Sequence, residues 1–258
     1  MLMNMTTVIV LAPDLGSGYD FYEDLLANST LPSHQIHFFK IDILARVVND
    51  KLTTQILEIN DQLLQVFKSL VASFTPSNKV IVTIACNTLS LPRFLQSSME
   101  FLRNYPHIHL LTTLEAVQAV ISTPKELFVG TKPLSYELNH VYPQIYTPIN
   151  SPVFNSNEER LAMVDLVQEI IWRVKAEQHS LVDTAPQYQP DLQSEENLKE
   201  LKLKTDLLLG KLSEKGVNDL ILGCTELPSA FKILAMEKQI HLNLINPVHL
   251  IAKEIADY

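Results

Sequence analysis

Short apolar runs and amphipathic stretches alternate along this chain of 258 residues. The apolar runs predict strands over residues 8–11, 36–39, 80–85, 108–111, 127–131, 145–149, 219–223 and 242–245. Apolar positions recurring every three or four residues predict helices over 19–27, 52–72, 113–121, 135–142, 158–177 and 195–215. Further helices are expected after the strands that end near residues 85 and 223, and from residue 248. Strands separated by helices indicate an α/β fold with parallel sheets covered on both faces.

One pattern occurs twice along the chain: a strand, a loop and a helix, and later a strand that is followed by a cysteine. We therefore expect two pseudo-symmetric lobes, each a mainly parallel sheet flanked by helices, with an active site in the cleft between them. The expected first lobe is 1–107 plus 247–258 and carries Cys86, and the expected second lobe is 108–246 and carries Cys224. Ligands of open parallel sheets bind beyond the carboxyl ends of the strands.

Composition and charge narrow the classes of partner. Hydrophobic residues make up 47% of the chain and charged residues 19%, which is typical of a globular protein. The net charge is −9, and the basic residues form no stripe, so nucleic acid is not an expected partner. The apolar runs are too short to span a bilayer, and the N-terminus lacks the positive region of a signal peptide. We expect a cytoplasmic protein that acts on a small molecule.

Two further segments bear on assembly. Residues 180–197 are polar and contain prolines, and they are typical of a loop insertion. Residues 161–174 carry enough apolar side chains to pack against a second copy, as in a homodimer, although burial within one chain explains them equally well.

The only two cysteines occupy matching positions, each directly after an apolar run and before a predicted helix. Backbone N–H groups and the positive end of a helix dipole converge at such a junction and favour the thiolate. Taken alone, either cysteine is better explained as a small buried apolar residue. The matched flanks of Cys86 and Cys224 favour a chemical role for both. A disulfide is not expected in a reducing compartment, and no spacing typical of metal ligands surrounds them.

Polar residues accompany the cysteines. Asn87, Thr88 and Thr225 follow them directly and could cap a helix or hold a substrate carboxylate, and the two roles are compatible. Asp14 lies in the first glycine-containing loop, where it could form a turn, orient Cys86, or accept a hydrogen bond from a substrate ammonium. Glu226 could complement a helix dipole or be a polar partner of Cys224.

These motifs resemble the aspartate/glutamate racemase superfamily, the cofactor-independent amino-acid racemases. Ile84-Ala85-Cys86-Asn87-Thr88 is similar to the first cysteine motif of glutamate racemases. Leu222-Gly223-Cys224-Thr225-Glu226-Leu227-Pro228 is similar to the second cysteine motif in its aspartate-racemase form. Gly130-Thr131 resembles the threonine-rich segment of the family. The chain departs from the family at Asp14-Leu15-Gly16, which lacks a serine, and at Val48-Asn49.

The resemblance implies a two-base racemisation without cofactor or metal. One thiolate removes the proton from the α-carbon, and the opposite thiol returns a proton to the other face. Cys86 and Cys224 would exchange these roles with the direction of the reaction. We expect the substrate contacts to come from Asp14, Asn87, Thr88, Thr131, Thr225 and Glu226. The substrate is aspartate or glutamate, with aspartate favoured by Glu226 and by the missing serine.

Two other interpretations stay open at this point. A related enzyme could use one cysteine in the isomerisation or decarboxylation of small dicarboxylates. The altered first loop and Val48-Asn49 are also compatible with an amino-acid-binding protein whose catalysis has lapsed. A cysteine hydrolase is less favoured, because no local motif supplies a histidine beside either cysteine.

Overall fold

The computed structural model describes residues 6–12, 16–41, 56–179, 195–235 and 241–257. The chain divides into two compact units, the first comprising 1–116 with 248–258 and the second 117–247. Asp14, residues 42–55 with Val48-Asn49, and most of the predicted insertion at 180–197 lie outside the described residues.

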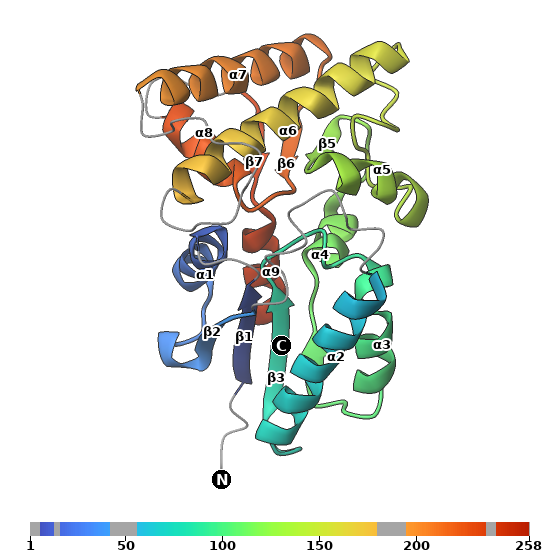
Figure 1. The fold of residues 1–258 in the computed structure, drawn as a ribbon, viewed down its shortest axis with the longest axis vertical. Helices are drawn as coiled ribbons and strands as arrows, with labels where there is room; N and C mark the ends of the chain where they lie inside the picture. The colour runs from blue at the N-terminus through green and yellow to red at the C-terminus, as the bar shows by residue number, and fades with distance from the viewer. Residues whose placement is uncertain (1–5, 13–15, 42–55, 180–194, 236–240, 258) are drawn as a thin grey trace. The chain divides into compact units, whose positions relative to one another are not determined.

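The first unit is built on a parallel sheet of four strands in the order β2-β1-β3-β4, of which Figure 1 labels β2, β1 and β3. Its strands are β1 (Thr6–Ala12), β2 (Ile36–Lys40), β3 (Lys79–Ile84) and β4 (Ile108–Leu110). Its helices are α1 (Gly16–Asn28), the short 3₁₀ helix η1 (Ser33–Gln35), α2 (Ile56–Ser73), α3 (Pro92–Leu102), the start of α4 (Thr113–Val120) and α9 (Pro247–Ala256).

Both faces of this sheet are buried, as expected for parallel strands between helices. On one face, side chains of β1 and β3 form a core with α1 and α9, including Val10, Ile81, Leu25 and Ile251. The alternate positions of the same strands point to the opposite face and are equally buried. Helices α2 and α3 pack against each other (Figure 1), and the amide of Asn60 bridges them, donating to the carbonyl of Arg93 (2.7 Å) and accepting from the N–H of Ser97 (3.1 Å).

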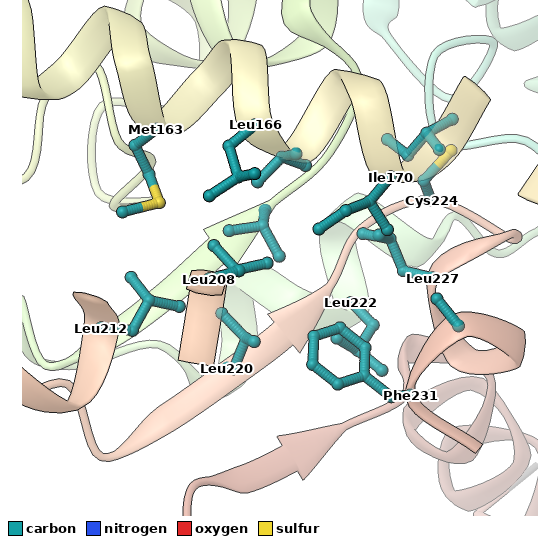
Figure 2. Close-up of a cluster of buried hydrophobic side chains, with 14 of the residues drawn as sticks. Met163, Leu166, Ile170, Leu208, Leu212, Leu220, Leu222, Cys224, Leu227 and Phe231 are labelled. Atoms are coloured by element: carbon teal, nitrogen blue, oxygen red, sulfur yellow. The ribbon is translucent and has the colours of Figure 1, made fainter. Parts of the chain in front are cut away.

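The second unit contains a parallel sheet with the order β5-β6-β7. Its strands are β5 (Glu126–Val129), β6 (Asp219–Leu222) and β7 (Asn243–Ile245). Its further helices are α5 (Lys132–Val141), α6 (Asn157–His179), α7 (Glu195–Glu214) and α8 (Leu227–Ala235). Helices α6, α7 and α8 bury leucine, isoleucine and phenylalanine side chains against one face of this sheet, and Figure 2 shows this core around Ile170, Leu222 and Phe231.

The apolar stretch at 161–174 is buried inside this core. Met163, Val167, Ile170 and Val174 are each less than 5% exposed within the second unit. Burial within one chain therefore accounts for these side chains, and the homodimer stays a prediction. In the part of the chain that the structure describes, no helix has both the length and the apolar character needed to cross a membrane.

The two units share a strand plan. In each, a first strand (β1 or β5) pairs in parallel with the strand that precedes a cysteine (β3 or β6), and that strand pairs in turn with the next one (β4 or β7). Leu11 opposes Ile84 in the first unit, and Val129 opposes Leu222 in the second. The sequence thus correctly predicts an α/β fold with parallel sheets flanked by helices.

Two details of the prediction differ from the structure. The sequence places 108–111 in the second lobe, but β4 hydrogen-bonds to β3 and belongs to the first sheet. The sequence also predicts a strand over 145–149, where the structure has turns. Pro148 cannot donate to a ladder, and the side chain of Asn150 accepts from the N–H of Thr147 (2.6 Å) in a local turn. One hydrogen bond, from the N–H of Phe128 to the carbonyl of Tyr146 (2.8 Å), still joins this segment to β5.

Candidate functional site

Each cysteine lies two residues beyond the last residue of a strand that has neighbours on both sides. Cys86 follows Ile84 at the end of β3, and Cys224 follows Leu222 at the end of β6. The ladder continues one step past each strand, because Ala85 N–H donates to Leu11 (2.8 Å) and Gly223 N–H donates to Val129 (2.7 Å). Both thiols are thus at the carboxyl edge of their own sheet, which is where ligands of parallel sheets bind. Neither cysteine forms a disulfide.

The connection after Cys86 is longer than the sequence suggests. Residues 87–90 form turns, and α3 begins at Pro92, six positions after the cysteine. The carbonyl of Cys86 accepts hydrogen bonds from the N–H (3.2 Å) and hydroxyl (3.1 Å) of Ser90. The expectation that Cys86 itself opens a helix is therefore wrong, and the first turn of α3 is too distant in sequence to stabilise its thiolate directly. Cys86 is half-buried.

Asn87 and Thr88 are buried in this turn, with 7% and 8% of their surfaces exposed. The side-chain oxygen of Asn87 accepts a hydrogen bond from the hydroxyl of Thr113, the first residue of α4. Before it, Thr112 and Glu115 form a capping box: the hydroxyl of Thr112 accepts from the Glu115 N–H (3.2 Å), and the Glu115 carboxylate accepts from the Thr112 N–H (3.3 Å). With its oxygen occupied, the amide of Asn87 retains its N–H groups as donors toward another acceptor.

Around Cys224, a thiol and a carboxylate are in direct contact. The Cys224 thiol donates to Oε2 of Glu226 (2.7 Å), and the hydroxyl of Thr225 donates to the same oxygen (3.3 Å). Glu226 is 1% exposed, and Cys224 is 8% exposed and belongs to the same apolar cluster as Ile170 and Leu227 (Figure 2). Because α8 begins at Leu227, Cys224 and Glu226 lie in the residues that lead directly into a helix. This arrangement allows the thiol proton to pass to a carboxylate that is shielded from water.

The backbone before Cys224 lies against an aromatic ring. A Cβ on Gly223 would come within 1.9 Å of Cζ of Phe128, whose ring is fully buried. Gly130 is also closely packed, because a Cβ added to it would lie 3.1 Å from the carbonyl oxygen of Gly223. Glycine at 223 therefore lets the segment that carries Cys224 pack directly onto β5.

Thr131 lies between β5, which ends at Val129, and α5, which begins at Lys132. Its carbonyl accepts from the N–H of Ser135 (2.9 Å), but its hydroxyl makes no hydrogen bond to the first turn of the helix. The N–H of Lys132 donates instead to Oε1 of Gln168 on α6 (2.8 Å), and the ammonium of Lys132 pairs with Asp165 (2.7 Å). The junction is thus held by α6 rather than by the Thr131 side chain.

The residues singled out beside the cysteines form two sets that are consecutive along the chain, one after β3 and the other after β6. Asn87 and Thr88 lie directly after Cys86, and Thr225 and Glu226 directly after Cys224. Sequence reasoning missed Thr113 and Gln168, whose contacts join positions 26 and 36 residues apart. Among the described residues, no group of three or more His, Cys, Asp or Glu side chains is placed to hold a metal ion.

Comparisons with known proteins identify the fold. No family model matches the chain, and no curated protein matches it. Among solved structures, an aspartate racemase homologue from Pyrococcus horikoshii is 17% identical, with 98% of this chain and 100% of that chain covered and a TM-score of 0.59. A glutamate racemase from Francisella tularensis in complex with D-glutamate is 17% identical, with 99% of this chain and 81% of that chain covered and a TM-score of 0.54. The aspartate racemase from Picrophilus torridus is 13% identical, with 98% of this chain and 94% of that chain covered and a TM-score of 0.54. The chain therefore has the fold of the aspartate and glutamate racemases.

Proposed function

We propose that this protein is a cofactor-independent amino-acid racemase that acts on aspartate or glutamate. The observation that carries the proposal is the placement of one cysteine at the carboxyl edge of each of two sheets with the same strand plan. A racemase must reach the α-carbon from both faces, and two similar units each supply one thiol for that purpose. The likeness to solved aspartate and glutamate racemases supports the same reaction class.

In the proposed reaction, the thiolate of one cysteine takes the α-proton, and the electron pair left on carbon is delocalised into the substrate carboxylate. The thiol of the other cysteine then gives its proton to the opposite face, and it becomes the thiolate. The two cysteines exchange protonation states in each turnover, so no external oxidant or cofactor is needed. General acid–base transfer contributes about 10²–10⁴-fold to such a rate, and donors around the carboxylate must supply much of the rest.

The residues beside the cysteines suit this reaction. Glu226 contacts the Cys224 thiol directly, and we assign it the role of accepting the thiol proton when Cys224 acts as base. The Asn87 amide and the hydroxyls of Thr88, Thr131 and Thr225 are assigned to the substrate carboxylates. Asp14 is assigned to the substrate ammonium.

One observation favours a second candidate, an amino-acid-binding protein with lapsed catalysis. Cys224 is buried within an apolar cluster, where a free cysteine often serves only as a small hydrophobic residue. The carboxylate of Glu226 is what distinguishes it from an inert core cysteine.

A single experiment separates the candidates. L- and D-aspartate and L- and D-glutamate are incubated with the protein in D₂O, without pyridoxal phosphate, and followed by proton NMR and polarimetry. A racemase removes the α-proton signal and the optical rotation of its substrate together, whereas a binding protein changes neither. Formation of a different product would indicate the isomerase or decarboxylase.

The cysteine variants test the two-base scheme. Cys86→Ala and Cys224→Ala are each expected to abolish racemisation, with circular dichroism confirming that they fold. Full turnover by Cys86→Ala would exclude the scheme even if wild-type protein racemises its substrate.

A further inference from the structure

The start of α5 is held by side chains of a neighbouring helix. Gln168 accepts a hydrogen bond from the N–H of Lys132, the first residue of α5, across 2.8 Å. Asp165, one turn earlier on α6, pairs with the ammonium of the same lysine across 2.7 Å. The two contacts differ in kind: one holds the backbone at the junction after β5, and the other joins two largely exposed side chains.

This arrangement changes what the Thr131 hydroxyl can do. Threonine in this position usually accepts from a backbone N–H in the first turn of the helix. Here the second helical position is Pro133, which has no N–H, and Thr131 makes no side-chain bond to the third position either, while the N–H of Lys132 is bonded to Gln168. The Thr131 hydroxyl makes no capping bond, so the helix does not occupy it.

We infer that Gln168 is a positioning residue for substrate binding, which it supports by holding the junction of Thr131 and Lys132. The inference rests on the proposed function, in which Thr131 contacts a substrate carboxylate. Without the Gln168 acceptor, the half-buried Lys132 loses this backbone hydrogen bond. The first turn of α5 then shifts to find another acceptor, and the Thr131 hydroxyl is the nearest one in sequence.

The test replaces Gln168 by methionine, which has similar size and cannot accept this hydrogen bond. Gln168→Met is expected to raise KM about tenfold or more for the racemised amino acid, with kcat changed much less, because a charge-assisted contact in the ground state is lost. Gln168→Glu keeps an acceptor at the same position and should restore much of the binding. Asp165→Asn, the matched control, loses only the exposed ion pair and should leave KM unchanged within about twofold.

A double substitution tests whether Gln168 acts through Thr131. In the Thr131→Val background, Gln168→Met should have little further effect on KM, because the contact that it positions is already absent. Equal effects in both backgrounds, or a change in melting temperature with no change in KM, would overturn the inference and assign Gln168 a purely structural role. These results are distinct from failure of the proposed function, which would appear as absence of α-proton exchange in the wild-type protein and would remove the inference with it.

Discussion

The Cys224 thiol donates a hydrogen bond to the carboxylate of Glu226, two residues later and 1% exposed. A thiol must lose its proton before it can act as a base, and a carboxylate in contact with it supplies the acceptor. Cys86 has a different environment, because it is half-buried and lies six positions before the first residue of α3, whereas Cys224 lies three positions before the first residue of α8. The two cysteines of the proposed racemase are therefore not chemically equivalent.

Glu226→Gln is the direct test of this contact. Glutamine preserves the size of the side chain but cannot take the thiol proton, so we expect kcat to fall about 10²–10⁴-fold. The fall should be accompanied by a changed pH profile of kcat, measured from α-proton exchange in D₂O between pH 6 and pH 9. Glu214→Gln, the same chemical change at an exposed position of α7, serves as control. An unchanged kcat and pH profile in Glu226→Gln would show that Cys224 does not depend on this carboxylate.

The unequal burial of the two thiols predicts selective modification. Iodoacetamide should alkylate Cys86 first in the native protein, because Cys224 is only 8% exposed and its thiol is hydrogen-bonded to Glu226. Both residues should react in 6 M guanidinium chloride. Mass spectrometry of peptides taken at successive times measures the two rates directly. Faster labelling of Cys224 than of Cys86 in native protein would contradict the burial described above.

Gly223→Ala is expected to destabilise the second unit. The added Cβ would lie 1.9 Å from a carbon of the fully buried Phe128 ring, and overpacking of this kind costs about 1–3 kcal/mol. The φ of Gly223 is not positive, so the effect is steric rather than conformational. Phe128→Leu should recover part of the loss in the double variant, as urea denaturation would measure.

Gly210→Ala is the matched control for this prediction. Gly210 lies inside α7, where an added Cβ meets no atom within 4 Å. Alanine there should raise stability by about 0.5–1 kcal/mol because it restricts the unfolded chain and favours helix. A gain of stability in both variants would show that the contact between Gly223 and Phe128 does not control packing here.

The surroundings of Glu254 predict that replacing this residue by glutamine stabilises the protein at neutral pH. Burial raises the pKa of this carboxyl group, and the charges of Glu115 and Asp257 raise it further. The pKa of Glu254 is therefore higher in the folded state than in the unfolded state. Because of this difference, the native state loses stability as the pH rises from the unfolded-state pKa through the folded-state pKa. Glu254→Gln should therefore increase the melting temperature at pH 7 and leave it nearly unchanged at pH 4. An equal shift at both pH values would indicate a packing effect instead of a charge effect.

Local patterns predicted most elements of the fold, and long-range contacts explain the differences. Alternation of apolar strands and amphipathic helices is a short-range signal, so β3 and β6 with their cysteines were identified correctly. The three-residue strand β4 was placed in the wrong lobe, since its assignment depends on pairing with β3 rather than on its own sequence. The contact of Cys224 with Glu226 spans two positions and was anticipated as one alternative. The contacts of Thr113 and Gln168 depend on how separate elements pack, and no local pattern specifies them.

Thr83→Val is expected to stabilise the protein. The side chain of Thr83 on β3 is fully buried, and its hydroxyl has no hydrogen-bond partner among the described residues. Valine has nearly the same shape without the polar group, so the substitution should raise the free energy of unfolding by about 1 kcal/mol, measured by urea denaturation. Thr205→Val is the matched control, because that hydroxyl is equally buried but donates to the carbonyl of Leu201 (2.8 Å), and its removal should lower stability. A loss of stability in both variants would mean that the Thr83 hydroxyl is satisfied in solution, with a buried water molecule as the simplest partner.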